Sequence, residues 1–350
     1  MLKRAIAVLV ALVVGTVVIT AGVLLYKMSP DLFRPDVNKV GGTEVVLEVA
    51  HADNDDDVER ACLVLKKRFD ERGSGVEVRR DGARHLAVVV PNGRRHDAIV
   101  SQANRLGAKP GRVEFRMVAN QTEDADAMAL AQGRFFDMKG VPVKPGEVGD
   151  EIVAGVGLAK RRFRWFPLSE GQARDWTRYG SARGAGGAVV RGGADRWVKS
   201  SDWSHVTMFV VDRGGGSEAY FVLCREPEEG VRVGGEAIER VRVGAVDHVR
   251  ESMLEVTFTE EGAAALRMMT GPYVIPHSSR AEEYHSLACI VDGEVVFAHD
   301  LATSIQRRQS FSAHVGPSDA DDLAAMLRGG ELPVKINPAS SKEAIVAPRR

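Results

Sequence analysis

Few cysteines, few aromatic residues and almost no net charge set the first limits on this sequence of 350 residues. Its three cysteines, Cys62, Cys224 and Cys289, stand among apolar neighbours and at no metal-binding spacing. They are expected to be buried small hydrophobic residues, although two of them could pair in an oxidising compartment. The net charge of −1 gives no overall field that would attract nucleic acid, so none is predicted as a partner.

The sequence also lacks the motifs of common enzymes. It has no GxxxxGK[ST] phosphate loop, no HExxH zinc motif and no GxSxG elbow. The acidic run that begins at Asp53 lacks the sixth-position glycine and the bidentate glutamate of a calcium loop, and it predicts a helix N-terminus. We therefore predict that the protein is not an enzyme and has no catalytic residue, cofactor-binding residue or metal ligand.

One long apolar run is present, from Ala5 to Tyr26, directly after Lys3 and Arg4. A run of about twenty residues can cross the hydrocarbon core as a helix, and basic residues stay on the cytoplasmic side. Residues 1–4 are therefore predicted to be cytoplasmic and residues 5–26 to be a transmembrane signal anchor in the cytoplasmic (inner) membrane. A cleavable signal peptide is the alternative, but its apolar stretch is usually shorter. The remainder is expected outside the membrane.

The first part after this run alternates between strand and helix patterns. Asp81-Gly82 favours a hairpin, and five apolar residues between Val58 and Phe69 fall on one helix face. The order β-α-β-β-α-β predicts an α+β, ferredoxin-like sandwich. The expected strands and helices are 43–49, 58–69, 75–80, 84–90, 94–106 and 111–118.

Residues 119–218 are less regular, with Gly/Arg-rich stretches and all four tryptophans. Regular patterns return near residue 219. Asp292-Gly293 predicts a second hairpin, and a short strand at 334–336 is expected to close the domain. The last residues, 339–350, are predicted to be a disordered tail.

Five segments carry motifs that stand out in this order. They are Gly41–Val49, Arg112–Val118 with Glu114 and Phe115, Phe258–Ala263, Leu287–Ala298 with Asp292 and Gly293, and Met326–Ile336 with Gly329, Leu332 and Pro333. They include Gly41 and Gly42 before the first strand and the Asp292-Gly293 hairpin. Together these motifs resemble the first periplasmic domain of the SecD/SecDF family of protein-export membrane proteins.

The resemblance implies a ferredoxin-like base, residues 35–118 plus 331–338, with an α+β head inserted at 119–330. Residues 119–218 diverge from the family pattern. The family's LGLDLRGG signature is kept only as its final two glycines. The later membrane spans that carry proton coupling in SecD do not follow in this sequence, so an export role is expected either to be passive binding or to depend on a partner that supplies those spans.

The function implied by the resemblance is that of a non-enzymatic, SecD-like accessory protein of Sec-dependent export that binds translocating or unfolded polypeptide. Expected partners are a Sec channel or SecF-like membrane subunit, unfolded secreted polypeptides, and the lipid bilayer through the N-terminal helix. The candidate polypeptide-binding surface consists of Phe163, Trp165, Trp176, Trp197 and Trp203, and the alternative is that these aromatics form core. The alternative function is a structural envelope protein that docks a protein partner with the same fold.

Overall fold

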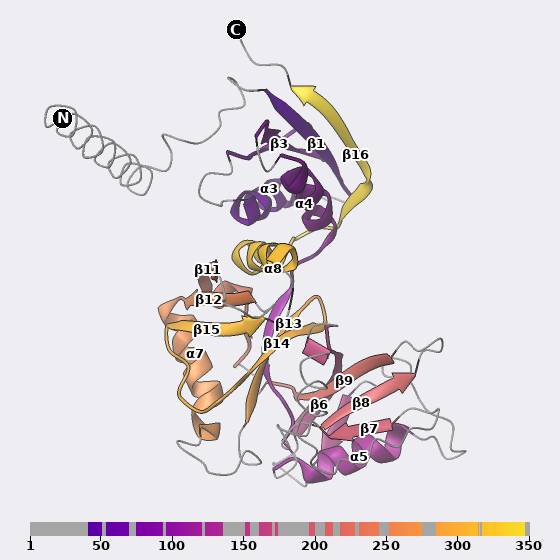
Figure 1. Cartoon of the computed structure of the whole chain (residues 1–350), viewed down its shortest axis with the longest axis vertical. Coiled ribbons are helices and arrows are strands. Elements are labelled where there is room, and N and C mark those ends of the chain that lie inside the picture. The colour runs from indigo at the N-terminus through magenta and orange to yellow at the C-terminus, as the bar shows by residue number, and fades with distance from the viewer. Residues whose placement is uncertain are drawn as a thin grey trace, which may run out of the picture. The chain divides into compact units, whose positions relative to one another are not determined.

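A computed structural model describes the parts of the chain from which the fold is built (Figure 1). It divides into two compact units, the first formed by residues 1–109 and 333–350 and the second by residues 110–332. The described residues are 41–50, 54–69, 75–93, 96–120, 123–135, 151–154, 161–169, 172–173, 196–199, 207–212, 218–227, 231–244, 252–274, 285–313, 315 and 317–346.

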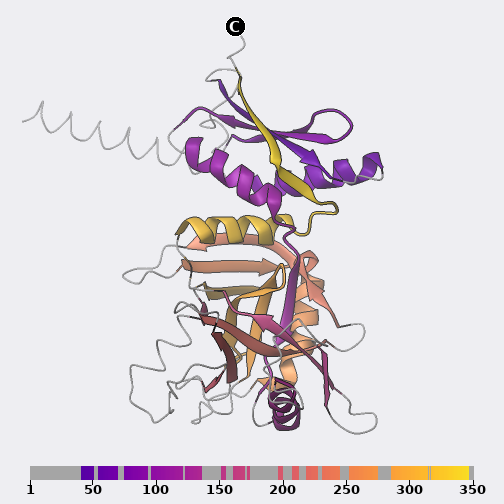
Figure 2. The same ribbon diagram turned by 90° about the vertical axis from the view of Figure 1, so that its right-hand side faces the viewer.

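The described strands of the first unit form a four-stranded sheet in the order β16-β1-β3-β2, and every neighbouring pair is antiparallel. Helices α3 and α4 lie on one face of this sheet (Figures 1 and 2). The chain therefore runs β-α-β-β-α before it enters the second unit, and it returns as β16. The bounds are β1 Gly42–Val49, α3 Asp55–Phe69, β2 Glu77–Arg80, β3 His85–Pro91, α4 His96–Ala108 and β16 Ile336–Val346.

The predicted amphipathic pattern of α3 is confirmed. Its first turn is acidic and its last turn is basic, which suits the helix dipole. The apolar residues of the predicted face, from Val58 to Phe69, are buried. Opposite them, Val45 and Leu47 of β1 and Val88 of β3 are fully buried, so the core of this unit lies between the sheet and its helices.

The last strand of the predicted β-α-β-β-α-β order needs correction. The strand expected at 111–118 exists as β4, Val113–Met117, but it pairs with strands of the second unit. The fourth strand of the first sheet is β16, which extends to Val346 through most of the predicted disordered tail. The polar stretch Ser340–Glu343 has little intrinsic strand preference, and pairing with β1 overrides that preference. For the same reason the first unit ends at residue 109 and not at 118.

The described strands of the second unit form three sheets. Their strand orders are β10-β4-β13-β14, β11-β12-β15 and β5-β6-β9-β8-β7. The bounds are β4 Val113–Met117, α5 Ala125–Phe135, β5 Glu151–Ala154, β6 Arg161–Pro167, β7 Arg196–Lys199, β8 Thr207–Asp212, β9 Glu218–Arg225, β10 Val233–Gly234, η3 Gly235–Ala237, β11 Ile238–Gly244, β12 Ser252–Phe258, α7 Glu260–Thr270, η4 Gly271–Tyr273, β13 Ser286–Val291, β14 Glu294–Asp300, β15 Arg308–Ala313 and α8 Pro317–Gly329.

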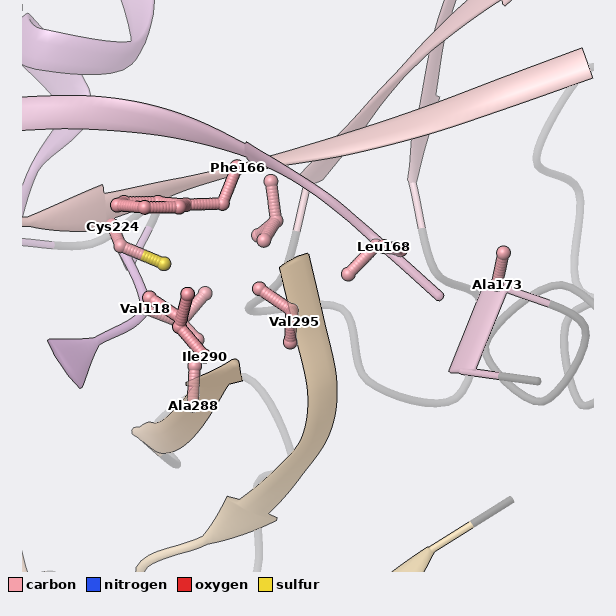
Figure 3. Close-up of a cluster of buried hydrophobic side chains, with 9 residues drawn as sticks. Val118, Phe166, Leu168, Ala173, Cys224, Ala288, Ile290 and Val295 are labelled. Atoms are coloured by element: carbon pink, nitrogen blue, oxygen red, sulfur yellow. The ribbon is translucent and has the colours of Figure 1, made fainter. Parts of the chain in front are cut away.

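Strands β6 and β9 of the five-stranded sheet have buried side chains on both faces. On one face, Phe163 and Trp165 of β6 pack with residues of α5 and β5. On the other face, Phe166, Leu168 and Cys224 meet side chains of β13 and β14, and Figure 3 shows these residues gathered around Ile290 and Val295 from the neighbouring sheet. Alternate residues of one strand therefore serve two separate cores.

Aromatic side chains fill the space beside the three-stranded sheet. The Phe258 ring lies edge-on to Phe115 of β4, at a centroid distance of 5.7 Å, and to Phe311 of β15, at 6.3 Å. Phe297 of β14 stacks on Phe311 at 4.8 Å. These contacts join strands of two sheets into one core.

Within the part of the chain that the structure describes, no helix is long and apolar enough to cross a membrane. The span expected at residues 5–26 lies outside the described residues.

Candidate polypeptide-binding site

The aromatic residues expected to bind polypeptide include two that are core. Phe163 is 1% exposed and Trp165 is 9% exposed, and both face α5 from β6. They therefore offer no open surface to a polypeptide. Trp176 and Trp203 lie outside the described residues, and only the backbone of Trp197, in β7, is described. Alternation of arginine with aromatic residues in β6 is the sequence signal that favours burial of Phe163 and Trp165.

An outer strand of the described sheet lies next to these buried aromatics. Among the described strands, β5 pairs only with β6 and forms one end of the five-stranded sheet. Ile152 and Ala154 of β5 are buried and fix the strand in place, while Val153 is 41% exposed. An outer strand presents backbone N–H and C=O groups that can pair with an added extended segment. The β5 edge is therefore the candidate site.

A buried group of charges supports this sheet at the ends of β6 and β9. Asp124, directly before α5, accepts hydrogen bonds from Arg225 Nε at 2.8 Å and from the backbone N–H of Asn120 at 2.8 Å. Arg225 Nη2 also donates to Glu123 at 3.1 Å, and Arg161 Nη1 of β6 donates to Asp124 at 3.4 Å. The side chains of Asp124 and Arg225 are only 1% and 7% exposed.

Burial disfavours the charged form of Arg225, but the field and hydrogen bonds of Asp124 and Glu123 outweigh burial. The pKa of the Arg225 guanidinium is therefore raised. The guanidinium carbon lies 4.6 Å from the ring centroid of Tyr273, and His285 Nε2 lies 3.5 Å from Glu123 Oε1. This cluster joins the five-stranded sheet to residues next to α7 and β13.

A second buried arginine lies on β4. Arg116 forms ion pairs with Glu114 at 2.5 Å and with Glu226 at 2.6 Å, and its guanidinium carbon lies 4.9 Å from the centroid of the Phe166 ring. Burial favours the neutral form of Glu114, but Arg116 outweighs burial and the pKa of Glu114 is lowered. Sequence reasoning missed both clusters, although Arg116 and Arg225 each stand next to apolar residues of a strand, which was the available signal.

The three cysteines are buried and unpaired, as predicted. Burial raises the pKa of the Cys224 thiol to about 12 and also raises the pKa of Cys289. Thiols held in this protonated form are weak nucleophiles. In the described part of the chain, no three His, Cys, Asp or Glu side chains gather closely enough to hold a metal ion.

The residues of the family-like motifs occupy turns, close contacts and core positions. Gly41 has φ 73°, and a Cβ on Gly42 would lie 2.3 Å from the Val90 carbonyl oxygen. Asp292 and Gly293 have φ 52° and 83°, as a two-residue hairpin turn requires, and Asp292 Oδ1 accepts the backbone N–H of Arg112.

The remaining motif residues follow the same pattern. Phe115 is buried beside Phe258 and Glu114 pairs with Arg116. Gly329 ends α8, and after it the N–H of Leu332 donates to the carbonyl of Pro110 at 2.7 Å. Pro333 follows directly, where the chain returns to the first unit.

Comparison with protein families identifies one segment. Residues 216–334 match the model of the SecDF P1 head subdomain. This segment is similar to a SecDF P1 head. It contains β9 to α8 of the second unit, while β4, α5, β5 and β6 lie before the matched residues. No curated protein matches the chain.

Solved structures of SecDF resemble the chain at low identity. A SecDF structure in a super-membrane-facing form is 17% identical, covering 91% of this chain and 33% of that chain with a TM-score of 0.47. A SecDF structure described as a membrane component that enhances protein export is 16% identical, covering 84% of this chain and 96% of that chain with a TM-score of 0.43. SecDF from Thermus thermophilus is 17% identical, covering 92% of this chain and 35% of that chain with a TM-score of 0.28. The chain thus spans about a third of the length of the first and the last of these.

Proposed function

We propose that this protein is a SecDF-like accessory of Sec-dependent protein export that binds unfolded or translocating polypeptide outside the membrane. The observation that carries the proposal is the match of residues 216–334 to the SecDF P1 head. One similar structure is described as a component that enhances protein export and another as translocon-associated. A Sec channel or SecF-like subunit is the proposed membrane partner, and the proposed role is that of a binding module without catalysis.

The first unit is proposed to be the ferredoxin-like base of this module. Its antiparallel strand order β16-β1-β3-β2, with helices after β1 and β3, supports the assignment. We further propose that residues 5–26 anchor the protein in the cytoplasmic membrane and that both units lie on the outer side.

Binding is proposed to occur by addition of an extended segment to the β5 edge. Backbone pairing recognises any polypeptide that is not yet folded, which suits a client of variable sequence. The buried Asp124–Arg225 pair and the core around Phe163 hold the neighbouring strands in place. A fixed edge lowers the entropic cost of ordering the bound segment.

A charge placed on the edge strand tests this mechanism. Fluorescence anisotropy would follow a labelled, permanently unfolded polypeptide on the full-length protein in detergent, for the wild type, Val153→Lys and Leu130→Lys. Val153 and Leu130 are 41% and 43% exposed, but Leu130 lies on α5 and not on the edge. Weaker binding of the Val153 variant alone is expected, because an edge lysine opposes strand addition. Equal effects of both variants would contradict the β5 site.

A crosslinking pull-down from membranes tests the broader role. Recovery of Sec channel subunits or exported precursors is the expected result. If these are missing and another envelope protein is enriched in stable amounts, the export role fails and a structural docking role takes its place.

A further inference from the structure

One face of the three-stranded sheet β11-β12-β15 carries mainly basic charge. The strand register places Arg240 beside Thr257 and Arg242 beside Glu255, and Thr257 is in turn beside Arg308. Directly opposed residues of an antiparallel sheet point to the same face. The three arginines therefore share one face, on the side away from the buried Leu254, Val256 and Phe311. The same face also carries Gly244, Met253, Ser310 and Ser312.

This face carries three arginines and a single carboxylate, Glu255. Arg308 Nη2 donates to Glu255 Oε2 at 2.8 Å, and the side chains of Arg308 and Glu255 are 66% and 38% exposed. Arg240 and Arg242 are exposed on the neighbouring strand. The hydrogen bond and field of Arg308, assisted by Arg242, lower the pKa of Glu255, so this carboxylate stays ionised near neutral pH.

The arginine that precedes β15 shows a different arrangement. Arg307 Nη2 lies 2.9 Å from Glu239 Oε2, and Arg307 Nη1 lies 3.5 Å from Glu260 Oε1. Two carboxylates therefore balance one guanidinium. On the sheet face the ratio is reversed, because three arginines (Arg240, Arg242 and Arg308) stand with one carboxylate, Glu255. The positive charge is therefore concentrated on the face and not spread over the whole sheet.

We propose that this face binds acidic segments of the unfolded polypeptide. Guanidinium groups form paired hydrogen bonds with carboxylates, and Thr257 and Ser310 add hydroxyl groups between them. A flexible chain can place separate carboxylates on either side of Glu255, whereas a continuous anionic bilayer would also bring negative charge onto Glu255. The inference rests on the proposed polypeptide-binding function and adds a preference for sequence to it.

Two peptides of about twenty residues test the preference against the full-length protein in detergent. One alternates glutamate with serine, and the other has glutamine in place of every glutamate. The test variant is Arg240→Gln/Arg242→Gln. The control variant, Arg232→Gln/Arg267→Gln, removes the same charge from exposed positions off this face. Fluorescence anisotropy at low and moderate salt reports affinity.

The glutamate peptide is expected to bind more tightly than the glutamine peptide to the wild type and to the control. The test variant should bind the glutamate peptide up to about tenfold more weakly, the effect of two exposed charge pairs. If both variants lose affinity for the glutamate peptide equally, or neither loses any, the proposed basic binding face is wrong. Binding of the glutamine peptide tests the proposed function separately. If neither peptide binds, the proposed function itself fails. Binding of phosphatidylglycerol vesicles that is lost in the test variant, without loss of the glutamate peptide, would identify lipid as the occupant instead.

Discussion

The two units of this protein bury charge in different amounts. Among the described residues of the first unit, Arg68 is the single buried charged or polar side chain. The second unit buries Arg116, Asp124 and Arg225, and the bond between Arg225 and Asp124 joins residues 101 positions apart. Apolar layers suffice where a sheet packs on its own helices. Where three sheets from distant segments meet, paired charges fix which strands lie together.

The largest effect is expected when one partner of the buried pair is removed. Asp124→Asn leaves Arg225 with a weaker set of acceptors in a buried position, which costs about 3–5 kcal/mol of the free energy of unfolding of the second unit. Tryptophan fluorescence during denaturation reports this unit selectively, because Trp165, Trp176, Trp197 and Trp203 all fall in its range.

The double variant Asp124→Asn/Arg225→Met separates pairing from packing. It removes both charges and is expected to be more stable than Asp124→Asn alone. If the double variant loses as much free energy of unfolding as Asp124→Asn and Arg225→Met lose together, the two residues do not stabilise each other. Buried charge pairs would then not distinguish the second unit from the first.

In the first unit the matching variant is Arg68→Met. Arg68 Nη1 donates to the carbonyls of Leu106 at 2.6 Å and Lys109 at 2.8 Å, at the end of α4. Loss of these bonds is expected to cost about 2 kcal/mol, since both carbonyls lose a charged donor. Hydrogen exchange followed by mass spectrometry should show faster exchange in β1 and β3. A lower midpoint of the tryptophan transition in the second unit would contradict the assignment of Arg68 to the first unit alone.

The same contrast explains what could be predicted from the sequence. Helix α3 follows from local signals, namely its acidic first turn and the spacing from Val58 to Phe69. The pairing partner of β4 cannot be predicted from local signals. A strand such as Val113–Met117 fits the sheet of the first unit as well as the sheet β10-β4-β13-β14 until its neighbours are known. Strand β16 was predicted only as a short strand at 334–336 before a disordered tail, since the polar residues that follow form a strand only through pairing with β1.

The candidate site shows the limit more sharply. Aromatic residues in a divergent segment suggested a binding surface, yet Phe163 and Trp165 are core because β6 lies inside the sheet, between β5 and β9. Strand order is a property of the whole sheet and cannot be derived from the residues of one strand. The two hairpin turns, by contrast, follow from adjacent residues, Asp81-Gly82 and Asp292-Gly293.

These two turns allow a matched test of smaller size. Gly82 has φ 86° and Gly293 has φ 83°, and a Cβ at either position meets nothing within 4 Å. Gly82→Ala and Gly293→Ala are therefore expected to cost about 1 kcal/mol each through backbone conformation alone. Hydrogen exchange would show the loss in the first unit, and tryptophan fluorescence in the second. A loss of more than about 3 kcal/mol at either glycine would show that the turn does more than reverse the chain.

The smallest expected effect is a pH dependence that belongs to the second unit. Burial lowers the pKa of His299, although Asp300 opposes this shift. Its ring lies edge-on to Phe311 at 5.3 Å, and Gln309 Nε2 lies 3.3 Å from His299 Nε2. The unfolded chain binds a proton on this residue at higher pH than the folded protein does. The contribution of His299 to the free energy of unfolding is therefore present above the unfolded pKa of about 6.5. It is lost as pH falls through the lower pKa of the folded protein.

Unfolding followed by tryptophan fluorescence at pH 7 and pH 5 measures this contribution. The wild type is expected to lose about 1 kcal/mol or less between the two through His299, and His299→Gln should lose less than the wild type. The pKa of Glu114 is lowered from 4.5, so its contribution is lost only at more acidic pH and does not enter this window. An unchanged pH slope in His299→Gln would mean that other groups carry the acid sensitivity. Hydrogen exchange measures the unfolding of the first unit at the same two pH values. If the free energy of unfolding of that unit changes with pH by the same amount, the pH dependence does not arise at His299.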